Sequence, residues 1–156
     1  MFQSNEEKDC FYMDKALVLA QKAYDAGEVP IGALIVSDSD EIIGTGYNQI
    51  ETMTSQISHA EISAIILATK YFDDWRLEEC TLYVTIEPCT MCYGALQLSR
   101  IKRLVFGAAS PVFGYHLDKD SFLSVYNNDT LLIKRGVREQ ACAQIVKKFF
   151  EQKRVS

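Results

Sequence analysis

The sequence lacks two features that would direct the protein to a membrane or out of the cell. No apolar run reaches about 18 residues, the length that a membrane-spanning helix requires. The first ten residues carry Glu6, Glu7, Lys8 and Asp9, so this segment is too acidic and too polar for a secretory signal or a transit peptide. We therefore expect no membrane partner and a cytoplasmic location.

An even set of cysteines is also missing. The chain has five in 156 residues, and disulfide frameworks are typical of smaller exported domains, so a reducing compartment fits better. Cys89 and Cys92 lie close together, which in such a compartment indicates metal or redox chemistry. Cys10, Cys80 and Cys142 have no partner at ligand spacing, and we expect them to be structural.

Positive charge is scarce, since the net charge is −5 at pH 7. This balance argues against a general nucleic-acid binder, because phosphate contacts supply much of such a protein's affinity. The charge is uneven, however, and residues 134–156 hold seven bases and two acids. That basic end could meet an anion, although charge alone favours a solvated helix face.

The length suits one compact domain over residues 1–156, and no repeat or linker divides it. Strands that alternate with helices require crossover connections, so we expect an α/β fold with a mixed sheet and helices on both faces. Spacing of apolar residues predicts helices at Phe11–Ala26, His59–Tyr71, Pro88–Leu98 and Arg138–Lys153, and strands at Ile31–Val36, Glu41–Tyr47, Thr81–Ile86, Arg103–Ala108 and Leu131–Lys134.

Two details of this pattern are less regular. Residues 109–129 are ambiguous. In the second helix, the apolar stripe is expected to comprise Ile62, Ile65, Ile66 and Ala68.

Two short segments at the starts of predicted helices carry groups suited to catalysis: His59-Ala60-Glu61 and Pro88-Cys89-Thr90-Met91-Cys92. One imidazole and two thiols can bind Zn²⁺, and three protein ligands leave the fourth tetrahedral position open, as catalytic zinc sites do. A helix start favours nearby anions and so helps to keep thiols as thiolates. Zinc makes hydroxide available near neutral pH, and Glu61 beside His59 is the candidate that moves protons. We expect one zinc ion per chain.

Each segment alone has a simpler interpretation. Ser58-x-x-Glu61 fits a helix capping box, and Cys89–Cys92 could be a redox pair or two buried apolar residues. His116, the other histidine, is expected in a surface or loop position. The joint pattern favours chemistry, because His-x-Glu upstream of Pro-Cys-x-x-Cys is the signature of zinc nucleobase deaminases.

At these residues the chain resembles the cytidine deaminase-like superfamily and, within it, the bacterial tRNA-specific adenosine deaminases. The resemblance implies a three-layer α/β/α fold with a central mixed five-stranded sheet, and a homodimer. It extends over nearly the whole chain and is also carried by Gly27–Ala33, Gly44–Asn48, Trp75–Leu77, Thr81–Ile86, Arg100–Ala108 and Ala141–Phe150.

The same resemblance implies a reaction and a set of substrate contacts. The wobble adenosine of a tRNA anticodon would become inosine, with activated water attacking C6 of adenine and Glu61 protonating the ring and then the departing ammonia. Asn48 would hold the nucleoside, Ile31 and Ile86 would pack against the base, and Ala60 would complete the contacts.

The tRNA anticodon loop would then be the partner of the chain. Its base can be splayed into the site at low cost, and Phe113 or Tyr115 could stack on a neighbouring base. Attraction of the phosphates would come from the basic terminal helix, through Lys147, Lys148, Lys153 and Arg154.

Two segments depart from the family pattern. Gln56-Ile57-Ser58 stands where the family usually has Asp-Pro-Thr, and Ala109–His116 replaces a run with an acidic residue and a lysine. Both lie where nucleotides next to the substrate would sit, and neither includes a metal ligand. A deaminase of a free nucleobase or nucleoside (cytosine, guanine or cytidine) would tolerate these changes and the negative charge. A non-catalytic zinc-stabilised binding module is the third hypothesis, and Glu61 argues against it.

Overall fold

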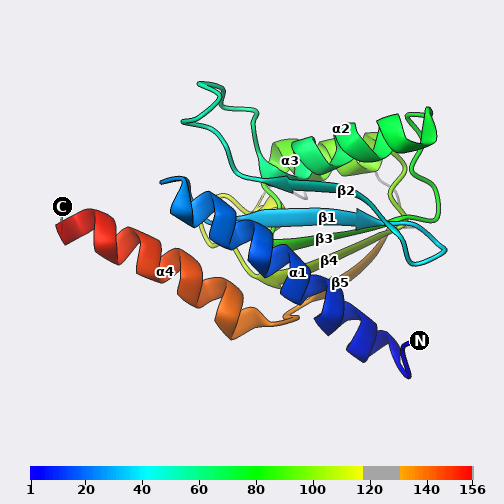
Figure 1. Ribbon diagram of the computed structural model, residues 1–156, viewed down its shortest axis with the longest axis horizontal. Coiled ribbons are helices and arrows are strands. Elements are labelled where there is room, and N and C mark those ends of the chain that lie inside the picture. Colours follow the sequence, from blue (N-terminus) through cyan, green and yellow to red (C-terminus); the bar gives the residue numbers. More distant parts are fainter. Residues whose placement is uncertain (118–130, 156) are drawn as a thin grey trace.

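The computed structural model describes residues 1–117 and 131–155. Figure 1 shows the order of their elements along the chain. They are α1 (Asn5–Asp25), β1 (Gly32–Val36), β2 (Ile42–Tyr47), α2 (Ala60–Phe72), β3 (Thr81–Ile86), α3 (Thr90–Leu98), β4 (Arg103–Ala108), the 3-10 helix η1 (Tyr115–Leu117), β5 (Leu132–Arg135) and α4 (Glu139–Val155).

The strands form one mixed sheet in the order β2-β1-β3-β4-β5. β1 runs antiparallel to β2 and β3, whereas β3, β4 and β5 run parallel to one another. Helices α1 and α4 cover one face of the sheet, and α2 and α3 cover the other (Figure 1). The expected three-layer fold with a mixed five-stranded sheet is therefore confirmed. None of the helices in the described ranges is long and apolar enough to span a membrane.

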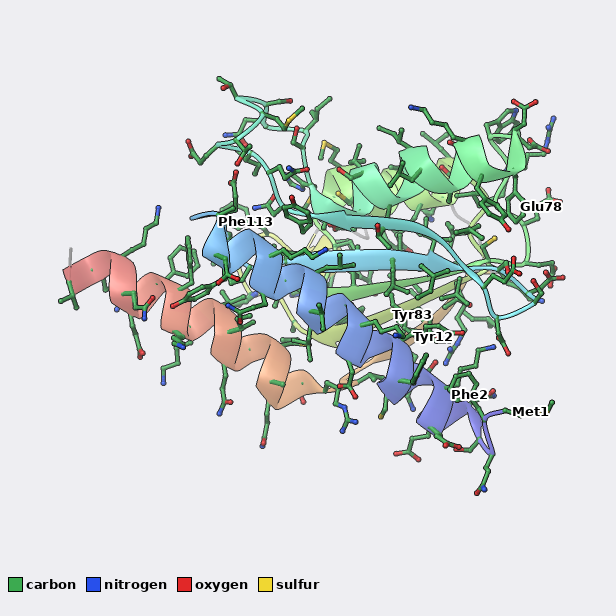
Figure 2. All side chains as sticks on the ribbon, in the orientation of Figure 1. Met1, Phe2, Tyr12, Glu78, Tyr83 and Phe113 are labelled. Atoms are coloured by element: carbon green, nitrogen blue, oxygen red, sulfur yellow. The ribbon has the colours of Figure 1, made fainter. Side chains whose placement is uncertain are left out.

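The central strands are buried on both faces, which explains their continuous apolar runs. Successive side chains of a strand point to opposite faces, so Leu82 and Val84 of β3 join the core beneath α2 and α3, while Tyr83 joins the core beneath α1. Tyr83 lies beside Tyr12 of α1, with ring centroids 5.2 Å apart (Figure 2). Full burial of each large apolar side chain contributes roughly 1.5–3 kcal/mol.

Small residues let α2 sit very close to β2. A Cβ on Gly44 would overlap the carbonyl oxygen of Ala64, and a Cβ on Gly46 would overlap that of Ala60. Ala60 and Ala64 are themselves fully buried. The helix backbone therefore rests almost directly on the strand, and this contact fixes the position of His59, which immediately precedes α2.

The first helix begins six residues before its predicted start at Phe11. The Ser4 hydroxyl caps it by accepting a hydrogen bond from the Glu7 N–H at 3.1 Å. The extra turns carry Asp9, which is only 1% exposed and accepts two hydrogen bonds from Arg103, at 2.6 and 2.7 Å. Apolar periodicity cannot recognise a buried acid, although Ser4-x-x-Glu7 does match a capping signal.

Two further predictions about the elements are corrected. Ile66, placed in the buried stripe of α2, is 48% exposed, whereas Ala64 takes the buried position instead. The last strand occupies Leu132–Arg135, one residue later than predicted. Of the ambiguous segment 109–129, residues 118–129 lie outside the described residues.

The contact between α2 and β2 predicts that Gly44→Ala destabilises the protein. Overpacking typically costs about 1–3 kcal/mol, and here the new methyl group meets backbone atoms, which no rotamer change can move. Gly94→Ala in α3 is the matched control, because a Cβ there has nothing within 4 Å. Urea unfolding should show a clear loss of stability for Gly44→Ala alone, and equal stability of both variants would contradict the close-packing argument.

Candidate metal centre

The starts of two helices bring three potential metal ligands together. His59 is the N-cap of α2 and Cys89 is the N-cap of α3, while Cys92 lies in the first turn of α3. The Nδ1 atom of His59 is 3.6 Å from the Cys89 sulfur and 3.5 Å from the Cys92 sulfur. All three ligand atoms lie within 4.8 Å of one another.

These separations fit a single zinc ion. Tetrahedral zinc with Zn–S bonds of about 2.3 Å and Zn–N bonds of about 2.0–2.1 Å places nitrogen and sulfur roughly 3.5 Å apart. The observed N···S distances of 3.5 and 3.6 Å match this value. Three protein ligands leave a fourth position for water or substrate. Cys10, Cys80 and Cys142 lie outside the group, as the sequence predicts.

Hydrogen bonds within the cluster set the charges of its members. A hydrogen bond with Cys92 lowers the pKa of Cys89 to about 4, and the contact with His59 adds to the effect. The same cysteine contact, together with burial, raises the pKa of Cys92, and the hydrogen bond with Cys89 raises that of His59. A metal held by all three groups requires both cysteines as thiolates and a neutral imidazole, so metal binding displaces protons from the cluster.

Glu61 lies in the first turn of α2 and is 4% exposed. Burial raises the pKa of its carboxyl group, and a hydrogen bond joins it to the side chain of Cys92. A buried carboxyl with a raised pKa can hold and release a proton nearer neutral pH. The alternative interpretation of Ser58-x-x-Glu61 as a capping box is wrong, because the N-cap of α2 is His59 and not Ser58.

The predicted substrate residues occupy both faces of the sheet. Asn48 is buried after β2, and its backbone N–H donates to the Ile31 carbonyl at 3.0 Å. Ile31 packs against the core beneath α2, whereas Ile86 packs against the core beneath α1. Ala60 starts α2 and has no exposed surface. Their contact with a substrate stays a prediction.

Sequence reasoning missed Glu28, which holds the segment between Asn48 and His59. Its buried carboxylate accepts hydrogen bonds from the Glu51 N–H at 3.0 Å and from the N–H and hydroxyl of Thr52, both at 2.7 Å. Burial alone would raise the pKa of Glu28, but these bonds outweigh it and the pKa is lowered. The available signal was a lone acid in the turn that precedes the apolar run Val29–Ala33.

Of the two aromatic residues at positions 109–117, directly after β4, Tyr115 is buried and Phe113 is exposed. Tyr115 cannot stack on a neighbouring base as expected, because it is 4% exposed and its ring already stacks on Tyr93, with centroids 4.1 Å apart. Phe113 remains 75% exposed. His116 lies at the surface in η1, as expected, but its Nδ1 is 2.6 Å from the carboxylate of Glu87.

Comparison with known proteins gives consistent results. Residues 6–108 match the family model of the cytidine and deoxycytidylate deaminase zinc-binding region. The chain is 44% identical to the tRNA-specific adenosine deaminase of Haemophilus influenzae, over 91% of this chain and 83% of that protein.

Solved structures of two kinds of deaminase are also similar to the chain. One comes from work on A-to-I editing by deaminases at the wobble position of transfer RNA; it is 35% identical with a TM-score of 0.76, over 86% of this chain and 98% of the other. Guanine deaminase from Bacillus subtilis is 34% identical with a TM-score of 0.60, over 71% of this chain and 67% of the other.

Proposed function

The chain belongs to the tRNA-specific adenosine deaminases and carries the zinc-binding region of the cytidine and deoxycytidylate deaminases, and we propose that it converts the wobble adenosine of a tRNA anticodon to inosine. The choice of substrate is carried by the 44% identity to the tRNA-specific adenosine deaminase of Haemophilus influenzae. Deamination itself is supported by His59, Cys89 and Cys92, which lie at distances that fit one zinc ion beside a buried acid in contact with Cys92. Water replaces the amino group of adenine, so the reaction is a hydrolysis that releases ammonia.

Residues of this chain would bind the zinc ion, transfer the protons and position the nucleoside. Zinc held by the three ligands would lower the pKa of water to about 7. Glu61 takes a proton from the attacking water, gives it to the adenine ring, and passes the next proton to the leaving amino group. A C6–O bond forms, the C6–N bond breaks, and adenosine plus water gives inosine plus ammonia. Asn48 holds the nucleoside and Ile31 packs against the base, whereas Ala60 has no exposed surface and Ile86 packs against the core on the other face of the sheet.

The basic end of α4 is the surface that attracts RNA. Lys147, Lys148, Lys153 and Arg154 are exposed on this helix. The charge of Lys153 contributes to the lowered pKa of Glu28, whose carboxylate holds the segment that leads into His59. The free end of α4 and that segment lie at the same end of the sheet, on the left of Figure 1. Local positive charge near the site can therefore offset the net charge of −5.

A homodimer in the cytoplasm is part of the same proposal. The outer side of α2 and the turn after it expose large apolar side chains, and such a patch marks an association surface. Five free cysteines suit a reducing compartment. The patch comprises Ile66, Leu67, Tyr71, Phe72 and Trp75.

Deamination of a free nucleobase is the second candidate. The similarity to guanine deaminase from Bacillus subtilis favours it, and a small substrate would need no basic surface. The two candidates share the metal centre and Glu61, so only the substrate distinguishes them.

The metal centre predicts about one zinc ion per chain, bound through both cysteines of the motif. Cys89→Ser and Cys92→Ser should each lose most of the zinc, because a hydroxyl is a poor substitute for a thiolate ligand. Cys10→Ser, which alters a cysteine outside the cluster, should retain it. Elemental analysis of the purified proteins measures this, and full zinc in both motif variants would refute the ligand assignment.

The proton-transfer role predicts that Glu61→Ala keeps its zinc and its fold but loses turnover. A missing general acid/base typically costs about 100- to 10,000-fold in rate, and the loss could be larger here because Glu61 handles successive transfers. Glu79→Gln changes an exposed acid and should leave the rate unaltered. A loss of only a few-fold in the Glu61 variant would reduce that residue to a structural role.

The substrate assignment predicts inosine formation in an anticodon stem-loop and no reaction with free adenosine. Neutral replacements of Lys147, Lys148, Lys153 and Arg154 should weaken RNA binding and flatten its salt dependence, by roughly 0.7–0.9 in logarithmic slope for each phosphate that is no longer neutralised. Asn48→Ala should slow deamination without removing zinc. Rapid ammonia release from a free base, with no inosine in any tRNA tested, would support the second candidate instead.

A further inference from the structure

A second buried acid lies beside the metal ligands without joining them. Glu87 follows β3 and is 5% exposed. One carboxylate oxygen accepts the Ser110 N–H at 3.1 Å, and the other accepts the His116 N–H at 3.1 Å and the His116 ring Nδ1–H at 2.6 Å. Both ends of the segment 110–116 are therefore tied to one side chain.

Gly114, within this segment, packs closely against the same carboxylate. A Cβ on Gly114 would lie 2.5 Å from both Cδ and Oε2 of Glu87, so only glycine allows this approach. Gly114 also pairs with Cys89 as an isolated antiparallel bridge, and the Tyr115 N–H donates to the Pro88 carbonyl at 2.9 Å. The segment thus lies directly against the loop that carries a metal ligand.

The two sides of the segment have opposite character. On the inner side, Tyr115 stacks on Tyr93 of α3 with ring planes 5° apart. On the outer side, Val112 and Phe113 are 67% and 75% exposed. Figure 2 shows Phe113 at the end of the sheet where α1 ends and the segment leading to α2 lies. An exposed aromatic ring on a firmly held segment of backbone is suited to stack on an unpaired nucleobase.

We propose that Glu87 is a positioning residue for the substrate: its carboxylate fixes residues 110–116 against the Cys89 loop and so presents Phe113 to the nucleotide next to the reacting base. This inference rests on the proposed function, because only an RNA substrate has such a neighbour. A carboxylate suits the task because it accepts on both oxygens. Glutamine would turn an amino group towards a backbone N–H and leave that donor unpaired.

The test compares Glu87→Gln with the wild type on an anticodon stem-loop, with zinc analysis and hydrogen exchange of the Ser110 and His116 amides. Loss of a hydrogen bond to a charged group should speed this exchange about tenfold or more. The KM for the stem-loop should rise by about the same factor while kcat changes only a few-fold, because the loop positions substrate and does not react. Zinc content should be unchanged.

Three further variants separate positioning from simple stabilisation. Asp9→Asn removes the charge of another buried carboxylate, one that binds Arg103 and Tyr83, and should lower the unfolding midpoint while leaving KM unaltered. His116→Phe removes only the ring donor to Glu87, so it should raise KM and speed amide exchange by a smaller factor than Glu87→Gln. This variant keeps the test possible if Glu87→Gln fails to fold. Phe113→Ala should raise KM, and its effect should add little to that of Glu87→Gln.

The outcomes distinguish this inference from the proposed function. A wild-type chain that forms no inosine in the stem-loop would overturn the proposed function, and with it the role of Phe113. An active wild type and a Glu87→Gln variant with unchanged KM and unchanged amide exchange would overturn the positioning role alone. A shift in KM that Asp9→Asn reproduces at equal loss of stability would also overturn it.

Discussion

The depth at which α2 rests on β2 governs the metal centre, because the three potential ligands come from the starts of two helices that pack on the same face of the sheet. His59 moves with α2, whereas Cys89 and Cys92 move with α3. Gly44 and Gly46 remove the side chains that would otherwise hold α2 away from the strand. Bond lengths to zinc tolerate deviations of about 0.2 Å, so a shift of α2 by the width of a methyl group would separate the nitrogen from the sulfurs.

Buried acids show how the same residue type is given different roles. Burying a carboxylate is costly unless hydrogen bonds or a partner charge compensate. Asp9, Glu28 and Glu87 each meet two or more donors and act as fixed anchors. Glu61 differs, because burial dominates its surroundings and raises its pKa, whereas hydrogen bonds lower that of Glu28. Environments that push carboxyl pKa values apart are how proteins assign acid–base roles.

The sequence predicts those features that depend on residue type and spacing, and it does not predict those that depend on contacts between distant segments. The ligands are identified by residue type and spacing, and the buried strands by their apolar runs, so both were accessible. Glu28 and Glu87 were not, because their partners are backbone N–H groups of distant loops, which every residue except proline possesses. Tyr115 was misjudged because an aromatic residue's type does not reveal whether another ring, here Tyr93, already covers it.

The two stretches that the resemblance marks as departures from the family pattern, Gln56–Ser58 and Ala109–His116, belong to the two segments that buried acids hold in place. In the segment between Asn48 and His59, Glu28 binds the backbone of residues 51 and 52. The two ends of this segment are joined by the Gln49 N–H, which donates to the Ser58 carbonyl at 3.0 Å. Glu87 binds both ends of the second. Both segments also touch a ligand, since the His59 side chain hydrogen-bonds the Gln56 backbone and Gly114 pairs with Cys89. Sequence change in these segments therefore alters the groups that are presented beside the metal centre. On the proposed function, selection among RNA substrates belongs to these anchored segments, while the chemistry belongs to the helix starts between them.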